Sequence, residues 1–483
     1  MKNKIFKIAL LSLLSLSIVP LINSCVKEDL NVDPKHPFVL PSENFLVSGL
    51  YQFAYYTTTP NVNFNNYAFF VQYLAETTYF DETRYDLKTR NQPRNHFNRM
   101  YVYTIGNIKN AKNQLPKESN STVVAANKLA TLEIFEVLAW ENLVNTFGDI
   151  PYSEAYEADS KSNYLAKYDD AKSIYIDLLK RLDAVITTIN IAEMGYSSGD
   201  VIYKGDMMKW LRTANAIKLR LGINLADTDP ALAKGAIESA YLSGLYQNSS
   251  DNFTFNFDRG TFTNPYYDNF VASGRNDFIP SEMVINTLKA KNDPRIDTWF
   301  TKVEVSTGVF DYVGGRFGYQ NPFGTRSHLN TAYFLQNDSP ASLISYTEIA
   351  FILAEAAQRG FDVGGSALDY YAAAIQASFA ESGITNLVAA YLVAHPYDGT
   401  DWKKSIGEQA YIALFGKAFP AWNFTRRLDQ PLLVNPASSL TTTIPFRMLY
   451  SDQEYVLNGA NVNAAATAIG GDEVSTKLFW DVN

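Results

Sequence analysis

Apolar residues recur every three to four positions through several long segments of the chain, a spacing that places them on one face of an α-helix. In residues 169–189, Ile174, Leu178 and Leu182 share such a face, and Asp170 precedes them as an N-terminal acid. The same spacing predicts helices in three further segments, 122–146, 206–226 and 341–359. The chain is therefore predicted to be mainly α-helical.

Residues 341–382 are predicted to form two helices joined by a short turn at residues 360–365. Gly360 is expected to end the first helix, because glycine readily adopts the left-handed conformation that closes a helix. Paired amphipathic helices with alanine at close-contact positions resemble tetratricopeptide units, although that repeat's consensus is degenerate here. The segment is thus interpreted as a tetratricopeptide-like helical hairpin.

Long, irregular, aromatic segments separate these helices. They cover residues 55–100, 251–278 and 308–335, and the whole chain contains 31 Tyr and 30 Phe. Loops of this length inside a compact domain are usually functional. We therefore expect the helices to form a scaffold and the loops to form the binding face.

The N-terminus has the pattern of a lipoprotein signal peptide. A positive start is followed by an uncharged segment, residues 8–22, which is too short for a comfortable membrane span. Residues 21–25 resemble a bacterial lipobox that ends at Cys25, and the chain contains 1 Cys. We expect residues 1–24 to be removed and Cys25 to carry acyl chains that anchor the protein in a membrane.

Residues 25–44 are predicted to be the lipidated cysteine and an extended tether, because Pro34, Pro37 and Pro41 disfavour a helix. Residues 26–29, Val-Lys-Glu-Asp, resemble the surface-export signal of Bacteroidetes lipoproteins. No linker-like segment divides the chain after residue 45, so residues 45–483 are predicted to form a single ligand-binding domain.

Charge and motif content argue against several functions. The formal net charge is −9, without a basic stripe, so nucleic acid is a poor candidate ligand. The four histidines, His36, His96, His328 and His395, are scattered singly, which argues against a zinc site. The glycine-rich segment 314–318 lacks the spacing of a phosphate loop and is interpreted as a turn. The sequence predicts neither a metal nor a cofactor.

No pattern in the sequence indicates catalysis. Asp81-Glu82 and Asp472-Glu473 are adjacent acids, whereas glycoside hydrolysis needs two carboxyl groups facing each other across a bond. There is no nucleophile-elbow sequence. Carboxyl groups that folding brings together cannot be recognised in the sequence, so a surface glycoside hydrolase remains an alternative.

A series of short blocks resembles the SusD/RagB family of outer-membrane nutrient-binding lipoproteins. The blocks occur in family order and span essentially the whole mature chain. They are Phe147-Gly148-Asp149-Ile150-Pro151-Tyr152, Tyr203-Lys204-Gly205-Asp206, residues 209–220, Asn292-Asp293-Pro294-Arg295, residues 346–360, residues 422–427, Pro445-Phe446-Arg447 and residues 477–481.

Most of these blocks have structural interpretations. Glu348 and Glu355, if they point inward, need arginine partners such as Arg426 or Arg427, because an unpaired buried carboxylate is costly. The chain departs from the family where it reads Phe446-Arg447 rather than two arginines. It also departs at Glu408-Gln409-Ala410-Tyr411, where relatives often have Gln-Lys-Trp. The side-chain partners of residues 446–447 and 408–411 are therefore not predicted.

The resemblance implies a mainly α fold, in which tetratricopeptide-like hairpins form an α-superhelix with long irregular loops on the ligand face. It also implies a non-catalytic lipoprotein of the outer membrane that faces the extracellular side. Such a protein captures oligosaccharides or peptides and delivers them to a SusC-type TonB-dependent transporter. A helical-repeat adaptor that binds other proteins is a further alternative.

We predict that the ligand wall is built from rings and a guanidinium of two loop regions. Aromatic faces pack on sugar rings, while polar side chains satisfy the sugar hydroxyls. The predicted residues are Tyr79, Phe80, Arg84, Tyr85, Tyr312, Phe317 and Tyr319. The alternative for each ring is that it packs a loop onto the core or contacts the transporter.

Overall fold

The computed structural model describes residues 40–157 and 162–482. The predicted signal peptide, Cys25 and residues 26–39 of the predicted tether lie outside the described residues. Helix α2 (Ser42–Thr58) begins within the range assigned to the tether, directly after Pro41, where proline is tolerated because a helix start has unpaired N–H positions. Within the described part of the chain, no helix combines the length and apolarity needed to cross a membrane.

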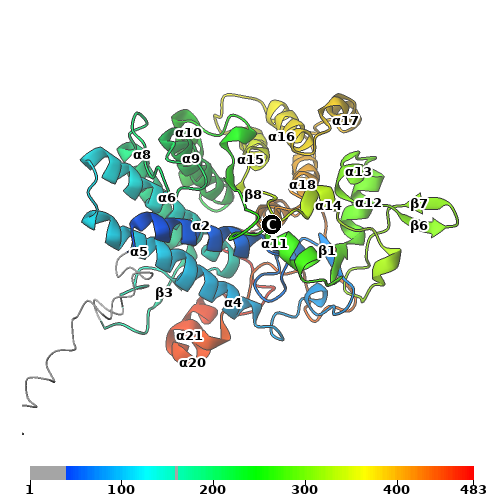
Figure 1. The fold of residues 1–483 in the computed structure, drawn as a ribbon, viewed down its shortest axis with the longest axis horizontal. Helices are drawn as coiled ribbons and strands as arrows, with labels where there is room; N and C mark the ends of the chain where they lie inside the picture. The colour runs from blue at the N-terminus through cyan, green and yellow to red at the C-terminus, as the bar shows by residue number, and fades with distance from the viewer. Residues whose placement is uncertain (1–39, 158–161, 483) are drawn as a thin grey trace, which may run out of the picture.

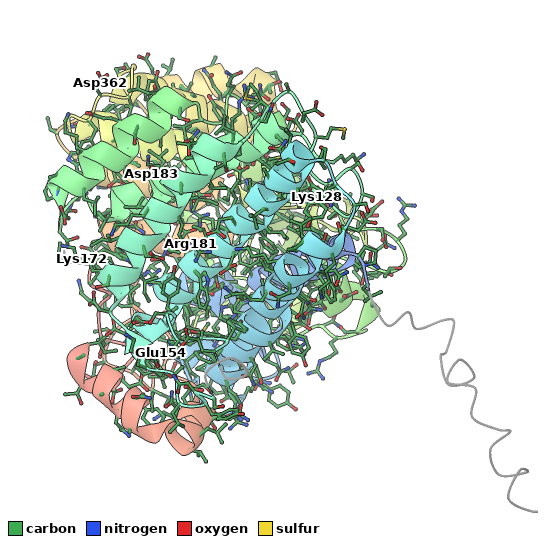
Figure 2. The ribbon with its side chains drawn as sticks, turned by 90° about the vertical axis from the view of Figure 1, so that its left-hand side faces the viewer. Lys128, Glu154, Lys172, Arg181, Asp183 and Asp362 are labelled. Carbon is green, nitrogen blue, oxygen red and sulfur yellow. The ribbon has the colours of Figure 1, made fainter. Side chains whose placement is uncertain are left out.

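Long helices build the left-hand and upper parts of the molecule in Figure 1. Figure 2 turns the left-hand side toward the viewer and shows α6, α8 and α10 lying next to one another, with Lys128 on α6 and Arg181 on α8. Besides α2, the helices of this scaffold are α5 (Gly106–Gln114), α6 (Thr122–Phe147), α8 (Ala171–Thr188), α9 (Met207–Asn224), α10 (Pro230–Ser243), α15 (Tyr346–Gln358), α16 (Ala367–Glu381), α18 (Trp402–Ala413) and α19 (Ala418–Leu428).

The helices predicted from periodicity are confirmed for α6, α8 and α9, and polar side chains fix where they begin. Ser121 accepts a hydrogen bond from the backbone N–H of Val124, and Asp170 accepts one from Ser173. Asp206 accepts from the two N–H groups at Met208 and Lys209. Each cap satisfies donors that would otherwise lack a partner in the first turn of the helix.

The predicted helical hairpin is confirmed by α15 and α16, which pack against each other. Gly360 has a φ of 84°, and the N–H of Phe361 donates to the carbonyl of Ala356, which closes α15 where the sequence predicted. The pairs α6–α8 and α9–α10 pack in the same way. The result is the tetratricopeptide-like, mainly helical architecture that the sequence predicted.

The prediction that the first helix of this hairpin starts at residue 341 is wrong. Residues Ala341–Ile344 form strand β8, which pairs antiparallel with β4 (Phe253–Phe255), and the helix starts after Ser345. Leu343 fits a helical spacing as well as a strand spacing, and the side chain of Ser345 accepts from the N–H of Glu348. This cap sets the true helix start.

The aromatic segments are less irregular than predicted, because they contain short helices and strands. Two-stranded antiparallel ladders pair β1 (Leu74–Glu76) with β5 (Phe278–Pro280), β2 (Ile150–Pro151) with β3 (Tyr168–Asp169), and β6 (Val303–Ser306) with β7 (Val309–Asp311). Further helices outside the aromatic segments are α12 (Glu282–Ala290), α13 (Arg295–Trp299), α17 (Val388–Ala394), α20 (Asp452–Leu457) and α21 (Gly459–Ala468). The aromatic segments themselves contain the short helices α3 (Tyr67–Phe70), α4 (Gln92–Asn98), α11 (Pro265–Tyr267) and α14 (Thr331–Phe334). Such short elements carry too few residues for a clear period.

The inward-pointing glutamates of α15 find arginine partners, one as predicted and one not. Glu355, fully buried, contacts Arg427 at 3.0 Å. Glu348 instead contacts Arg220 of α9 at 3.1 Å, and Arg220 also lies 3.3 Å from Glu141. Arg426 pairs with neither glutamate, because its guanidinium donates to the backbone carbonyls of Asn145 and Phe446. Glu348 pairs with Arg220 because α9 packs against α15, and this packing cannot be recognised in the sequence.

Candidate functional site

The end of the β1–β5 ladder brings together loops that are far apart in the sequence, at the right-hand side of Figure 1. The N–H of Thr77 donates to the carbonyl of Asp277 at 3.0 Å, which extends the ladder by one bond. The side-chain amide of Asn321 donates to the carbonyls of Glu76 at 3.0 Å and Tyr319 at 2.8 Å. The loop that carries Tyr319 is therefore held beside the first aromatic segment, residues 55–100.

The glycine-rich segment 314–318 lets the loop that carries Tyr319 lie directly against the β1–β5 ladder. The N–H of Gly315 donates to the carbonyl of Pro280 at 2.8 Å. A Cβ atom at Gly315 would come within 2.5 Å of the side chain of Ile279 and 2.9 Å of that of Ala75. Glycine is thus required by a close backbone approach.

A first hollow of about 280 Å³ lies beside Tyr79. The Tyr79 side chain is 54% exposed, and the guanidinium carbon of Arg90 lies 5.2 Å from its ring centre. Arg90 is held from behind, since its Nε donates to Glu82 at 2.7 Å. The other lining residues are Asn61, Val62, Asn63, Glu76, Asn269, Ser273, Arg275, Asp277 and Phe278. An exposed ring among amide and guanidinium groups has the composition of a site for a polyhydroxylated ligand.

A second hollow of about 490 Å³ lies where Thr77 and Asn276 leave the ladder. Its other wall is the loop 320–323, which Asn321 fastens to β1. Phe323 stacks on His328 with ring centres 3.9 Å apart, so the ring is held in place. Glu76 lines the first hollow and Thr77 the second, so both hollows open near the end of β1.

Four of the predicted ligand-wall residues are at least partly accessible: Tyr79, Phe80, Arg84 and Tyr319. The guanidinium of Arg84 lies 5.1 Å from the ring centre of Phe80. That of Arg316 lies 3.6 Å from the ring centre of Tyr319. A ring with one face on an arginine is oriented in advance and can offer its other face to a ligand.

Tyr85, Phe317 and Tyr312 are placed differently. Tyr85 is 2% exposed and Phe317 5%, and their rings pack together with centres 5.8 Å apart. Tyr312 is also buried, and its hydroxyl donates to Asp297 of α13. These three rings fasten loops to the core, so only the four accessible residues can contact a ligand in this conformation.

Two buried carboxyl groups support the first hollow from behind. Glu76 and Glu82 are 2% and 0% exposed and lie close enough for their charges to interact. Burial raises the pKa of Glu76 well above its ordinary value of 4.5, and the neighbouring Glu82 raises it further. Burial also raises the pKa of Glu82. A proton kept by this pair explains how two acids share an enclosed site.

This shared proton makes the stability of the fold depend on pH. The native protein keeps a proton on Glu76 above pH 4.5, where the unfolded chain has released it, so stability falls as the pH rises from 4.5. One such proton contributes a slope of about 1.4 kcal/mol per pH unit. In Glu76→Gln that slope should be absent from urea-unfolding free energies measured between pH 5 and pH 7. The exposed Glu193→Gln serves as the control and should follow the wild type; a Glu76→Gln curve parallel to the wild type would contradict the shared proton.

Within residues 40–157 and 162–482, no three His, Cys, Asp or Glu side chains gather closely enough to hold a metal ion. His96 is fully buried beside Asn142, and burial lowers its pKa to about 4. It is therefore neutral at physiological pH and acts as a core polar group.

The sequence of this chain matches one known protein family. A family model named SusD-like and described as "Starch-binding associating with outer membrane" matches residues 34–451. The chain belongs to this SusD-like family. A search among curated proteins found no significant match.

Solved structures of SusD-like proteins superpose along most of the chain. A chitin-binding protein with 26% sequence identity matches with a TM-score of 0.79, covering 92% of this chain and 100% of its own. A SusD homologue from Bacteroides uniformis has 25% identity and a TM-score of 0.78, with 91% and 99% covered. A chitin-binding SusD homologue from Flavobacterium johnsoniae has 22% identity and a TM-score of 0.77, with 92% and 98% covered; it supports the fold alone.

Several polar residues of the first hollow in this SusD-like chain were not predicted from its sequence. Asn61, Asn63, Arg90, Arg275 and Asp277 come from three separate segments and form no motif. Arg90 could have been suspected only from its place within the first aromatic loop. Arg275 and Asp277 could not be assigned without the pairing of β1 with β5, which places them beside Glu76.

Proposed function

We propose that this protein is a non-catalytic, carbohydrate-binding lipoprotein of the outer membrane that captures oligosaccharides at the first hollow, beside Tyr79, and at the second hollow near the end of β1. The description of the SusD-like family and the chitin-binding relatives support a carbohydrate as the ligand. The observation that carries the proposal is the exposed ring of Tyr79, backed by Arg90 and surrounded by amide and guanidinium side chains.

The site is suited to reversible capture. Tyr79 provides a flat apolar face for a sugar ring, and Asn61, Asn63 and Arg275 provide hydrogen-bonding groups around it. A carrier that releases its cargo needs an affinity of only about 1 μM to 1 mM, equivalent to roughly 4–8 kcal/mol. The hollows are open, so a chain longer than the contact region can extend out of them.

The rest of the proposal concerns location and delivery. Acyl chains on Cys25 would hold the domain at the outer membrane, on the extracellular side, and a SusC-type TonB-dependent transporter would receive the cargo. This part rests on the lipobox resemblance, on residues 26–29 and on the family's association with the outer membrane. Copurification of such a transporter with the native protein from outer membranes would support it, whereas mature protein without acyl groups would contradict it.

Removing the exposed ring should weaken carbohydrate binding with little effect on the fold. In isothermal titration with maltoheptaose and chitohexaose, we expect Tyr79→Ala to reduce the affinity for the bound glycan about tenfold, equivalent to about 1.4 kcal/mol. Tyr164→Ala is the matched control, because that ring is 75% exposed and belongs to another loop. Unchanged affinity in Tyr79→Ala would remove the first hollow from the site, and cleavage of either glycan would contradict a purely binding role.

A further inference from the structure

A separate cavity of about 360 Å³ is lined by residues of α11, α13, α14, β8, α16 and the turn between α18 and α19. Its volume is at the lower end of the range of small-molecule sites. Pro340 at its rim is exposed, whereas Trp299 and Phe415 in its wall are buried. The cavity thus suits a small molecule rather than a polymer.

Aromatic rings form one part of this cavity. Trp299 and Phe415 stack with ring centres 5.4 Å apart and an interplanar angle of 22°. Phe334 meets Phe415 edge-on at 5.4 Å, and Tyr266 also lines the space. This part accommodates an apolar or aromatic group.

An ion pair lies at another part of the cavity. Lys417 Nζ contacts Glu381 at 2.5 Å, and the two side chains keep 14% and 23% exposure. The second oxygen of Glu381 accepts a hydrogen bond from Thr347 at 3.0 Å. The cavity therefore presents one cation and one anion side by side, which matches a ligand that carries both charges.

The cationic side is reinforced by the start of α19. Lys417 occupies the N-cap position and makes no side-chain cap, so the N–H groups of Ala418 and Phe419 remain available at the start of this 11-residue helix, whereas Pro420 has none. A recess of about 20 Å³, room for about one water-sized group, shares Thr58, Ser342 and Lys417 with the cavity and is lined by Ala418 and Phe419.

Arg220 provides a second, independent indication of a ligand there. It lines the recess at 4% exposure, and its Nη1 has no hydrogen-bond partner, although its Nε faces Glu141 and Glu348. A buried guanidinium N–H without a partner is costly unless an acceptor joins it. The Nη1–H of Arg220 is a donor that a ligand carboxylate would satisfy, while Oε2 of Glu141 and Oε2 of Glu348, beside it, also lack hydrogen-bond partners.

We propose that this cavity binds an α-amino acid with an apolar or aromatic side chain, either free or at the end of a short peptide. The carboxylate lies toward Lys417, the start of α19 and Arg220, the ammonium lies toward Glu381, and the side chain packs among Trp299, Phe334 and Phe415. The inference does not depend on the first or the second hollow.

Titration of the purified protein with L-phenylalanine and its derivatives tests the two charges separately. L-phenylalanine should bind at least tenfold more tightly than L-phenylalaninamide, which lacks the carboxylate, and than N-acetyl-L-phenylalanine, which lacks the ammonium. If only L-phenylalaninamide binds more weakly, the site recognises a free carboxylate and is assigned to a peptide C-terminus. If only N-acetyl-L-phenylalanine binds more weakly, the site recognises a free ammonium and is assigned to a peptide N-terminus. No binding of L-phenylalanine or L-leucine, or binding of neutral sugars alone, would overturn the proposal.

Variants assign each charge to its residue. Lys417→Met should weaken the binding of L-phenylalanine at least tenfold and leave the affinity for L-phenylalaninamide unchanged. Glu381→Gln should weaken the binding of L-phenylalanine and leave the affinity for N-acetyl-L-phenylalanine unchanged. Lys404→Met, an exposed lysine of α18, is the matched control. Tyr79→Ala should leave amino-acid binding unchanged, which separates this site from the proposed glycan site. If Lys417→Met has a melting temperature far below that of the wild type, the test rests on the near-isosteric Glu381→Gln. Unchanged affinity of Glu381→Gln for L-phenylalanine would overturn the proposed site.

Discussion

Arg427→Leu is expected to lower the free energy of unfolding by about 3–5 kcal/mol. Arg427 and Glu355 are 4% and 0% exposed and lie 3.0 Å apart, so the substitution leaves a buried carboxylate with Arg359 as its remaining close cation. Arg427 also donates to Asn224 at 2.8 Å, which ties α19 to α9 as well as to α15. Urea unfolding followed by circular dichroism measures the change.

The control for this prediction is an arginine pair at the surface. Arg259 and Asp338 lie 2.9 Å apart but are 76% and 37% exposed. An exposed pair contributes about 0–1 kcal/mol, so Arg259→Leu should change stability little. Equal effects of the two substitutions would show that the buried pair does not hold the three helices together.

Tyr85→Ala should cost about 3–5 kcal/mol of stability, although Tyr85 and Tyr79 are only six residues apart in the same loop. The Tyr85 ring packs against Phe70 and Phe317, and its hydroxyl accepts a hydrogen bond from the Gln72 amide at 3.0 Å. Alanine would leave a cavity and an amide with one partner fewer.

The paired substitution Tyr79→Ala removes an exposed ring and should change the free energy of unfolding by no more than about 0.5 kcal/mol. Thermal or urea unfolding of the two variants side by side measures the contrast. A small loss for Tyr85→Ala would mean that its ring is not part of the core and could contact ligand after all.

The long helices could be predicted from the sequence because each has enough turns for an apolar stripe to be recognised. α8 illustrates this: its stripe and the cap at Asp170 together fixed the helix within two residues at each end. The segment 341–345 could not be assigned, since a four-residue strand carries no clear period. Its identity depends on pairing with β4, which is distant in the sequence.

The site could be predicted only in part, because composition does not distinguish a ring that faces solvent from one that fastens a loop. Tyr79 and Tyr85 belong to the same aromatic segment, yet one is 54% and the other 2% exposed. Arg275 and Asp277 reach the first hollow only through the β1–β5 pairing. The same limit applies to the partner of Glu348, which folding brings from another helix.

The central claim is that a sugar chain binds on the exposed ring of Tyr79. A crystal structure of the protein soaked with the oligosaccharide that binds best tests this claim most directly. We predict a sugar ring in van der Waals contact with Tyr79, with hydroxyl groups bonded to side chains of the first hollow such as Asn61 or Arg275. A sugar bound elsewhere, with Tyr79 still open to solvent, would contradict the account.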